Sequence, residues 1–332
     1  RLTLIRTGEQ AYRLLWSHHH ILLDGWSMPI LLREVFTLYA AHAQGRTVGL
    51  PPARPYRDYI AWLGEQDMAA AETFWRRTLA GFTAPTELRL QAPGADRLAP
   101  GQTRMAEQEV RLSVEETAEV QSLVRGQGLT LSTVVQAAWA LLLSRYSGEQ
   151  DVVFGATVSG RPAALAGADR MVGLFINTLP VRAQLAPQAE VLPWLRQFQA
   201  ELAEARQYEY SPLVDVQGWS EVSRDRPLFE TILVFENYPV EELREALAGQ
   251  SGGLEVRDVR AFEQTNYPLT LISGPGHALN LKVSYDRARF DDASVRRLLG
   301  HLRTLLSGIA SAALSPGRRL SEYPSSAAPH TR

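Results

Sequence analysis

Three consecutive histidines, His18, His19 and His20, are followed closely by Asp24 and Gly25, between an apolar run and a helical pattern. Histidine is the side chain whose unperturbed pKa lies near neutrality, so it can accept or release a proton there. A histidine at the end of a strand, beside a turn, is well placed to act as a base on a bound substrate. This segment is the strongest candidate for chemistry in the chain.

The histidines allow three interpretations. Neighbouring residues on a strand alternate faces, so His18 and His20 can share one face and a metal ion. However, no second cluster with ligand spacing accompanies them, and structural zinc usually takes four ligands, so we expect no metal. A second interpretation is that at least one histidine satisfies a buried hydrogen bond. The third is general base catalysis, with Asp24 and Gly25 shaping the turn, and the combined spacing favours it.

Composition limits the possible functions. The chain has 332 residues, 45% of them hydrophobic, and a formal net charge of −2. Without a strongly basic patch or an apolar run long enough for a bilayer, we expect neither nucleic acid nor membrane as a partner. The chain has no cysteine. This excludes disulfides, zinc-thiolate sites and a cysteine nucleophile, and is typical of a reducing, cytoplasmic location.

The elements that must position the histidines are mixed. Alternating or apolar runs predict strands at 2–6, 11–17, 151–158, 179–185, 229–235, 254–262, 268–273 and 278–286. Helical spacing predicts helices at 29–43, 56–75, 114–126, 131–146, 190–208 and 291–307. Ser113 and Glu116 form a capping box before one helix, Gly148 ends the next, and Ser27 is interpreted as a cap. The absence of a regular βαβ order favours an α+β fold.

The segment from His19 to Gly25 resembles the His-His-x-x-x-Asp-Gly signature of condensation domains of nonribosomal peptide synthetases. Other segments resemble further motifs of that family in the same order: Tyr56 to Trp62, Asp151 to Pro162, Met171 to Thr178 with Arg182, Arg224 to Phe229, Phe235 to Pro239, and Tyr285 with Asp286. The likeness covers about residues 1–310. We identify the chain as a member of this family.

The resemblance implies a two-lobed, V-shaped α+β fold like chloramphenicol acetyltransferase, with a tunnel between the lobes. It also implies amide formation: the amine of a carrier-bound aminoacyl acceptor attacks the thioester of a carrier-bound acyl or peptidyl donor. The expected partners are donor and acceptor peptidyl carrier domains and an adenylation domain of the same assembly line. The reactive thiols are phosphopantetheine arms on those carriers, and this chain binds no cofactor of its own.

The resemblance also suggests roles for the residues of the signature. His20 faces the substrates and positions the amine or takes its proton, a contribution of about 10²–10⁴-fold. Asp24 and His19 support the turn. Gly25 permits a tight turn, and its N–H can face the developing oxyanion.

We expect supporting roles for two arginines and one asparagine outside the signature. Asn177 and Arg182 are expected to brace the tunnel floor between the lobes, and Arg161 to order its own turn. In the family, an arginine from an earlier motif pairs with the signature aspartate. That motif is missing here, so we expect Asp24 to lack its partner.

Domain boundaries follow from composition and the resemblance. We expect residues 1–90 to be the remainder of an N-terminal lobe, 91–105 a linker, 106–310 the C-terminal lobe, and 311–332 a disordered tail. Because the chain opens with Arg1 directly before the predicted strand at 2–6, and so inside a sheet, we expect a truncated first lobe and poor activity of the chain alone.

Other functions on the same fold remain open. One is an acyltransferase that uses coenzyme A, and another is a catalytically silent module that recruits a carrier or an enzyme. An epimerisation domain shares the signature as well. The later motifs favour the condensing branch, and retention of His20 and Asp24 argues against a silent module.

Overall fold

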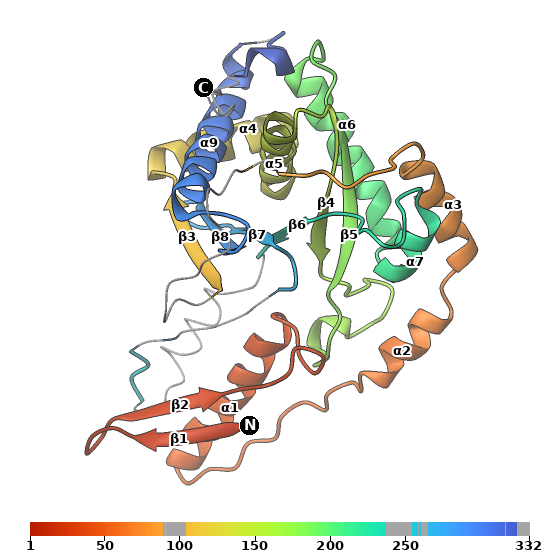
Figure 1. The fold of residues 1–332 in the computed structure, drawn as a ribbon. Helices are drawn as coiled ribbons and strands as arrows, with labels where there is room; N and C mark the ends of the chain where they lie inside the picture. The colour runs from red at the N-terminus through yellow and green to blue at the C-terminus, as the bar shows by residue number, and fades with distance from the viewer. Residues whose placement is uncertain are drawn as a thin grey trace. The chain divides into compact units, whose positions relative to one another are not determined.

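The computed structural model describes residues 1–88, 90, 104–236, 254–257, 259, 265–315 and 317–323. The chain divides into two compact units (Figure 1). Unit 1 contains Arg1–Gln66, Ser159–Ile176 and the described residues of Tyr238–Ala261. Unit 2 contains the described residues of Asp67–Val158, Asn177–Asn237 and Phe262–Arg332. Each unit is therefore built from segments that are distant in sequence.

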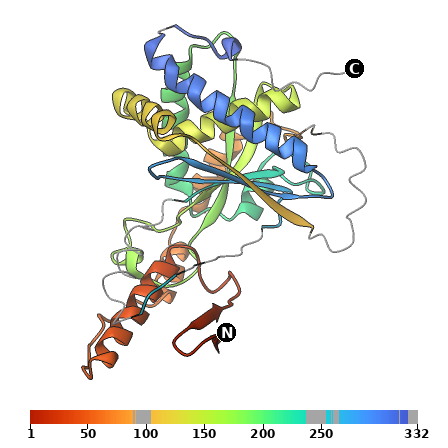
Figure 2. The same ribbon diagram turned by 90° about the vertical axis from the view of Figure 1, so that its left-hand side faces the viewer.

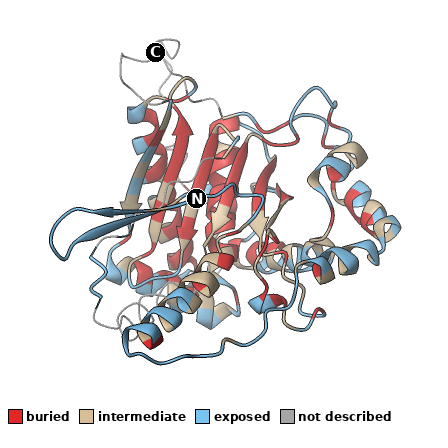
Figure 3. Cartoon of the chain, turned by 90° about the horizontal axis from the view of Figure 1, so that it is seen from below, coloured by how far each residue is buried: buried red, intermediate tan, exposed pale blue. Residues whose placement is uncertain are grey.

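Unit 1 carries the histidines and has a small core. Its strands β1 (Leu2–Arg6) and β2 (Tyr12–Trp16) form an antiparallel hairpin. Helices α1 (Ser27–Ala43) and α2 (Arg57–Gly64) and a short 3₁₀ turn at Ala168–Arg170 follow along the chain. Its buried apolar cluster consists of Tyr59, Leu165, Ala168, Met171 and Phe175. The hairpin itself is mainly exposed (Figure 3).

Unit 2 is organised around one mixed sheet of six strands in the order β3-β8-β7-β6-β4-β5. The strands are β3 (Met105–Arg111), β4 (Asp151–Val158), β5 (Asn177–Gln184), β6 (Thr231–Phe235), β7 (Leu269–Gly274) and β8 (Asn280–Asp286). The β4–β6 and β6–β7 pairs are parallel and the others antiparallel. The sheet strands are mainly buried (Figure 3).

The helices of unit 2 pack on this sheet. They are α3 (Met68–Thr78), α4 (Val114–Gln127), α5 (Leu131–Ser147), α6 (Val191–Ala205), α7 (Leu213–Trp219) and α9 (Asp292–Ala310), with 3₁₀ turns at Arg206–Tyr208, Ser311–Leu314 and Leu320–Glu322. Helices α4, α5 and α9 cover one face (Figures 1 and 2) and share the larger core with α6. Helices α3 and α7 contribute to a second core with Val153 and Ile232.

The ends of α4 and α5 confirm the local sequence signals. Ser113 Oγ accepts the Glu116 N–H at 3.2 Å, and Glu116 Oε2 accepts the Ser113 N–H at 2.7 Å. Gly148 ends α5 with φ 82°, a left-handed conformation that favours glycine. Most of α5 is buried, including Trp139, as expected for a helix that is apolar on nearly every side.

Four elements differ from the sequence prediction. The stretch 56–75 forms two helices, because Asp67 caps α3 by accepting the Ala70 N–H at 2.9 Å. Strand β3 and helix α7 were not predicted. Strand β3 lies at the sheet edge, and its less exposed side carries Ala106, Gln108 and Val110, so its apolar signal is weak. Residues 254–257 and 259 form no strand, and the rest of the predicted strand at 254–262 lies outside the described residues.

The units also differ from the expected domain boundaries. Residues 67–88 group with unit 2, and residues 159–176 group with unit 1. The described part of the expected tail, up to residue 323, packs on unit 2. Tyr323 is buried and donates to Gly308 O at 3.1 Å, and burial raises the pKa of Tyr323 to about 12. Most of the expected linker at 91–105 and residues 324–332 lie outside the described residues.

Among the described helices, none alone is long and apolar enough to cross a membrane. Helices α4 and α5 together have the length and composition of a membrane span, but the chain bends by 110° between them.

Packing of β4 against Phe229 gives a stability prediction. A Cβ atom on Gly155 would lie 2.3 Å from Phe229 Cε2 and 2.8 Å from Ile232 Cγ2. Gly155→Ala should therefore lower the free energy of unfolding by about 1–3 kcal/mol, measured by urea denaturation. Gly126→Ala in α4 is the control, since a Cβ there meets no atom within 4 Å and should stabilise the helix by up to ~1 kcal/mol. Equal midpoints for Gly155→Ala and wild type would contradict the packing described.

Candidate active site

The turn after β2 presents the three histidines differently. His19 Nδ1 accepts the N–H of Ile21 at 3.1 Å, so its ring helps to shape the turn. The ring of His18 lies edge-on to Trp16, with centroids 5.9 Å apart. His20 is exposed, and its side chain makes no hydrogen bond within the part of the chain that the structure describes. The turn therefore uses His19 and leaves the imidazole of His20 open to solvent.

Asp24 anchors the other end of this turn. Its side chain is fully buried, at 0% exposure. Oδ1 accepts the backbone N–H of Ser27 at 2.9 Å and the Ser27 hydroxyl at 2.8 Å, while Oδ2 accepts the N–H of Phe175 at 3.0 Å. The Asp24 N–H donates to Gly173 O at 3.1 Å. These contacts occupy the carboxylate, so Asp24 supports the turn and is not free for proton transfer.

The expectation that Asp24 lacks an arginine partner is wrong. Arg161 Nη2 lies 3.1 Å from Asp24 Oδ1, and the Arg161 side chain is only 7% exposed. The same guanidinium donates to Met171 O at 2.8 Å and to Ala168 O, which orders the turn as predicted. It also lies over the Phe175 ring, 4.1 Å from the centroid. A buried carboxylate needs such a cation, and the segment Ser159–Ile176 supplies it.

Tyr56 holds the segment that receives Asp24. A Cβ at Gly173 would lie 2.2 Å from Tyr56 Cδ2, so only glycine lets the ring approach this closely. The Tyr56 hydroxyl donates to Leu174 O. Burial raises the pKa of Tyr56, and the negative charge of Asp24 raises it further while Arg161 lowers it. The phenol therefore stays protonated and keeps donating this hydrogen bond.

The two predicted floor residues lie in unit 2, where protein groups occupy their polar atoms. Asn177 Nδ2 donates to Glu209 O at 2.9 Å and to Ser211 O at 2.6 Å. Arg182 makes a two-point ion pair with Asp151, at 2.9 and 2.6 Å, and donates to two carbonyls at the end of α3. Asp151 raises the pKa of Arg182. A role for either residue toward substrate stays a prediction.

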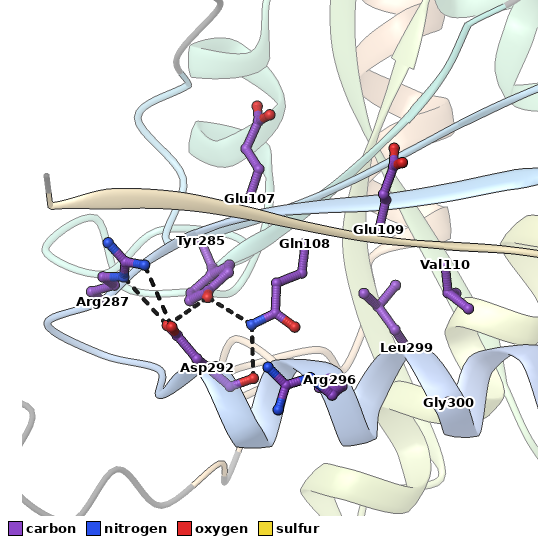
Figure 4. A pocket seen from close by; sticks show the side chains of 10 residues that line it. All are labelled: Glu107, Gln108, Glu109, Val110, Tyr285, Arg287, Asp292, Arg296, Leu299 and Gly300. Carbon is purple, nitrogen blue, oxygen red and sulfur yellow. Dashed lines mark hydrogen bonds and ion pairs between the residues drawn. The ribbon is translucent and has the colours of Figure 1, made fainter.

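Neither metal ligands nor the cavity beside α9 points to a different site. No group of three His, Cys, Asp or Glu side chains within the described ranges is arranged to hold a metal ion. A cavity of about 540 Å³ lies between β3, β8 and α9 (Figure 4). Its polar groups bond to one another: Tyr285 donates to Asp292 at 2.7 Å and accepts from Gln108 at 3.0 Å. The sequence-predicted site residues do not line it.

The buried pair gives a second stability prediction. Arg161→Ala leaves the Asp24 carboxylate buried without a cation, so it should cost about 3–5 kcal/mol of the free energy of unfolding, measured in urea. Combining it with Asp24→Asn should recover part of that loss. The control is Arg76→Ala, which removes an exposed i,i+4 pair with Glu72 and should cost only about 0.3–0.5 kcal/mol. Additive effects of Arg161→Ala and Asp24→Asn would show that the two side chains do not interact.

Comparisons with known proteins identify the family of the chain. The Condensation domain family matches residues 1–327. The chain is 48% identical to a linear gramicidin synthase protein of Brevibacillus parabrevis over 97% of its length, but spans only 4% of that protein. It is 43% identical to chondramide synthase cmdD of Chondromyces crocatus over 93% of its length and spans 8% of that protein.

Solved structures show the same fold. The X-domain from teicoplanin biosynthesis is 25% identical, with a TM-score of 0.76, 98% coverage of this chain and 74% of that one. The first condensation domain of the calcium-dependent antibiotic synthetase, in complex with a substrate analogue, is 18% identical, with a TM-score of 0.73 and coverage of 97% of this chain and 70% of that one. These likenesses confirm the expected α+β fold of the chloramphenicol acetyltransferase type. The chain belongs to the condensation domain family of nonribosomal peptide synthetases.

Proposed function

We propose that this chain forms an amide bond between a carrier-bound acyl or peptidyl thioester and a carrier-bound aminoacyl group. The observation that carries the proposal is the exposed imidazole of His20 on a turn anchored by the buried Asp24–Arg161 pair. Membership of the condensation domain family supports it, as do relatives that are parts of peptide synthases.

Amide formation from a thioester requires a neutral amine next to the thioester carbonyl. The acceptor nitrogen attacks the carbonyl carbon, the new C–N bond forms and the C–S bond breaks. The amine loses a proton, and the departing thiolate gains one. An α-amino group has a pKa of about 7.7–8.0, so it is partly protonated near neutral pH. A base that takes its proton is therefore useful, but deprotonation costs little free energy. Orienting the amine therefore contributes at least as much as accepting its proton, and His20 does both.

The other site residues support His20. Asp24 and His19 position the turn, because both carboxylate oxygens of Asp24 and Nδ1 of His19 accept hydrogen bonds from the protein. The N–H of Gly25 faces the oxyanion that develops on the thioester carbonyl. Asn177 and Arg182 stabilise the wall along which the substrates lie.

The substrates arrive on partner domains. We propose donor and acceptor peptidyl carrier domains, each presenting its thioester on a phosphopantetheine arm, and an adenylation domain of the same assembly line. The relatives support this, because the chain matches only 4% of the linear gramicidin synthase protein. A four-domain nonribosomal peptide synthetase bound to AMP and glycine contains a region with this fold, at a TM-score of 0.77.

One structural neighbour favours a second candidate. The teicoplanin X-domain shares the fold and has been solved as a complex with OxyB. Recruitment of a partner without amide formation is therefore the alternative function. Retention of the complete His-His-x-x-x-Asp-Gly signature in this chain favours catalysis.

Mutation of His20 tests the proposal. In the full-length protein supplied with two loaded carriers, His20→Ala should reduce dipeptidyl carrier formation by about 10²–10⁴-fold, measured by mass spectrometry. His18→Ala is the matched control from the same exposed turn and should retain activity. Undiminished product from His20→Ala would refute the role of this residue. Carrier binding without product from any carrier pair would support recruitment instead.

A further inference from the structure

The hydroxyl of Ser27 lies at the centre of the polar cluster around Asp24. Ser27 begins α1 and has 0% exposure. Its Oγ is 2.8 Å from Asp24 Oδ1 and 2.9 Å from Gly173 O, and it accepts the Gly173 N–H at 3.1 Å and Arg161 Nη2 at 3.3 Å. A hydroxyl has one proton and two lone pairs. It can therefore donate to Asp24 or to Gly173 while it accepts from Gly173 and Arg161.

A second serine in the same chain, which also follows an aspartate by three residues, shows what these local contacts do without long-range partners. Ser294 in α9 is also buried, at 1% exposure, and follows Asp291 by three residues. Its N–H and hydroxyl donate to Asp291 at 2.8 and 2.6 Å, and Arg297 donates to its Oγ at 2.7 Å. All of these contacts are local to the start of α9. This Asp-x-x-Ser pattern is therefore a device for starting a helix.

Ser27 also donates its N–H and its hydroxyl to the aspartate three residues before it, although α1 has Trp26 as its N-cap and no side-chain cap, and Ser27 makes long-range contacts in addition. Its partners Arg161 and Gly173 are 134 and 146 positions away in sequence. The hydroxyl thus joins the turn that carries His20 to the segment that carries Arg161. A helix cap does not require these contacts, which are absent at Ser294 among the described residues.

We infer that Ser27 is a positioning residue for the amide-forming reaction, acting through Asp24 on the turn that holds His20. The inference rests on the proposed function. Loss of the hydroxyl leaves the Gly173 N–H without this acceptor and removes one of the three groups that donate to Asp24 Oδ1. Misplacement of a catalytic group by about 1 Å can cost 10²-fold in rate, so the effect should fall on turnover.

The test compares three variants in the full-length protein with loaded carriers. Ser27→Ala removes the hydroxyl, and Ser27→Cys replaces it with a larger thiol that is a weak hydrogen-bonding group. Both should lower kcat roughly 10- to 100-fold while KM for each carrier stays unchanged. Ser294→Ala, the matched control, should keep kcat. Hydrogen exchange of the peptide containing Gly173 should accelerate in both Ser27 variants and not in Ser294→Ala.

Each outcome decides the inference. Wild-type kcat in both Ser27 variants would overturn it, as would an equal fall of kcat in Ser294→Ala, which would show a stability effect only. If the wild-type protein forms no product from any carrier pair, the proposed function fails separately. The exchange measurement then still decides: unchanged protection at Gly173 overturns the positioning role, and lost protection supports it.

Discussion

The structure of unit 1 depends on the neutralisation of one buried carboxylate. Removing a charge from water costs several kcal/mol, and the cost is offset only when a cation and hydrogen-bond donors surround the group. At Asp24 these are Arg161, Ser27 and the N–H of Phe175. Because the apolar core of this unit is small, the polar cluster contributes much of what fixes one arrangement of the chain.

This arrangement explains how the short exposed turn that carries the histidines is held in one conformation. The histidine turn has few buried apolar contacts of its own, since His18, His19, His20, Ile21 and Leu22 are all exposed. The turn is held in place by the hydrogen bonds and the ion pair of Asp24, which lies directly before α1. The exposed imidazole of His20 is therefore held by a buried polar anchor, and the residues that fix the turn differ from the residue that it exposes.

Local signals can be predicted well from sequence, whereas distant pairings cannot. The capping box at Ser113 and the end of α5 at Gly148 depend on neighbouring residues, so their patterns are visible in the chain itself. The partner of Asp24 is 137 positions away, and the sequence around Arg161 indicates only a turn residue. The resemblance pointed to an arginine upstream instead. The edge strand β3 is hard to predict because Val110 is the only β-branched residue on its less exposed side, beside Ala106 and Gln108.

The division of unit 1 has a consequence for recombination between synthetases. The segment Ser159–Ile176 lies in sequence between two strands of unit 2, yet it supplies the cation for Asp24. A chimera joined at one point between residues 66 and 159 would take Asp24 from one parent and Arg161 from the other. An exchangeable part of this domain is therefore defined by the buried ion pair that its segments share, and not by contiguous sequence. The segment with Asp24 and the segment Ser159–Ile176 must come from the same parent.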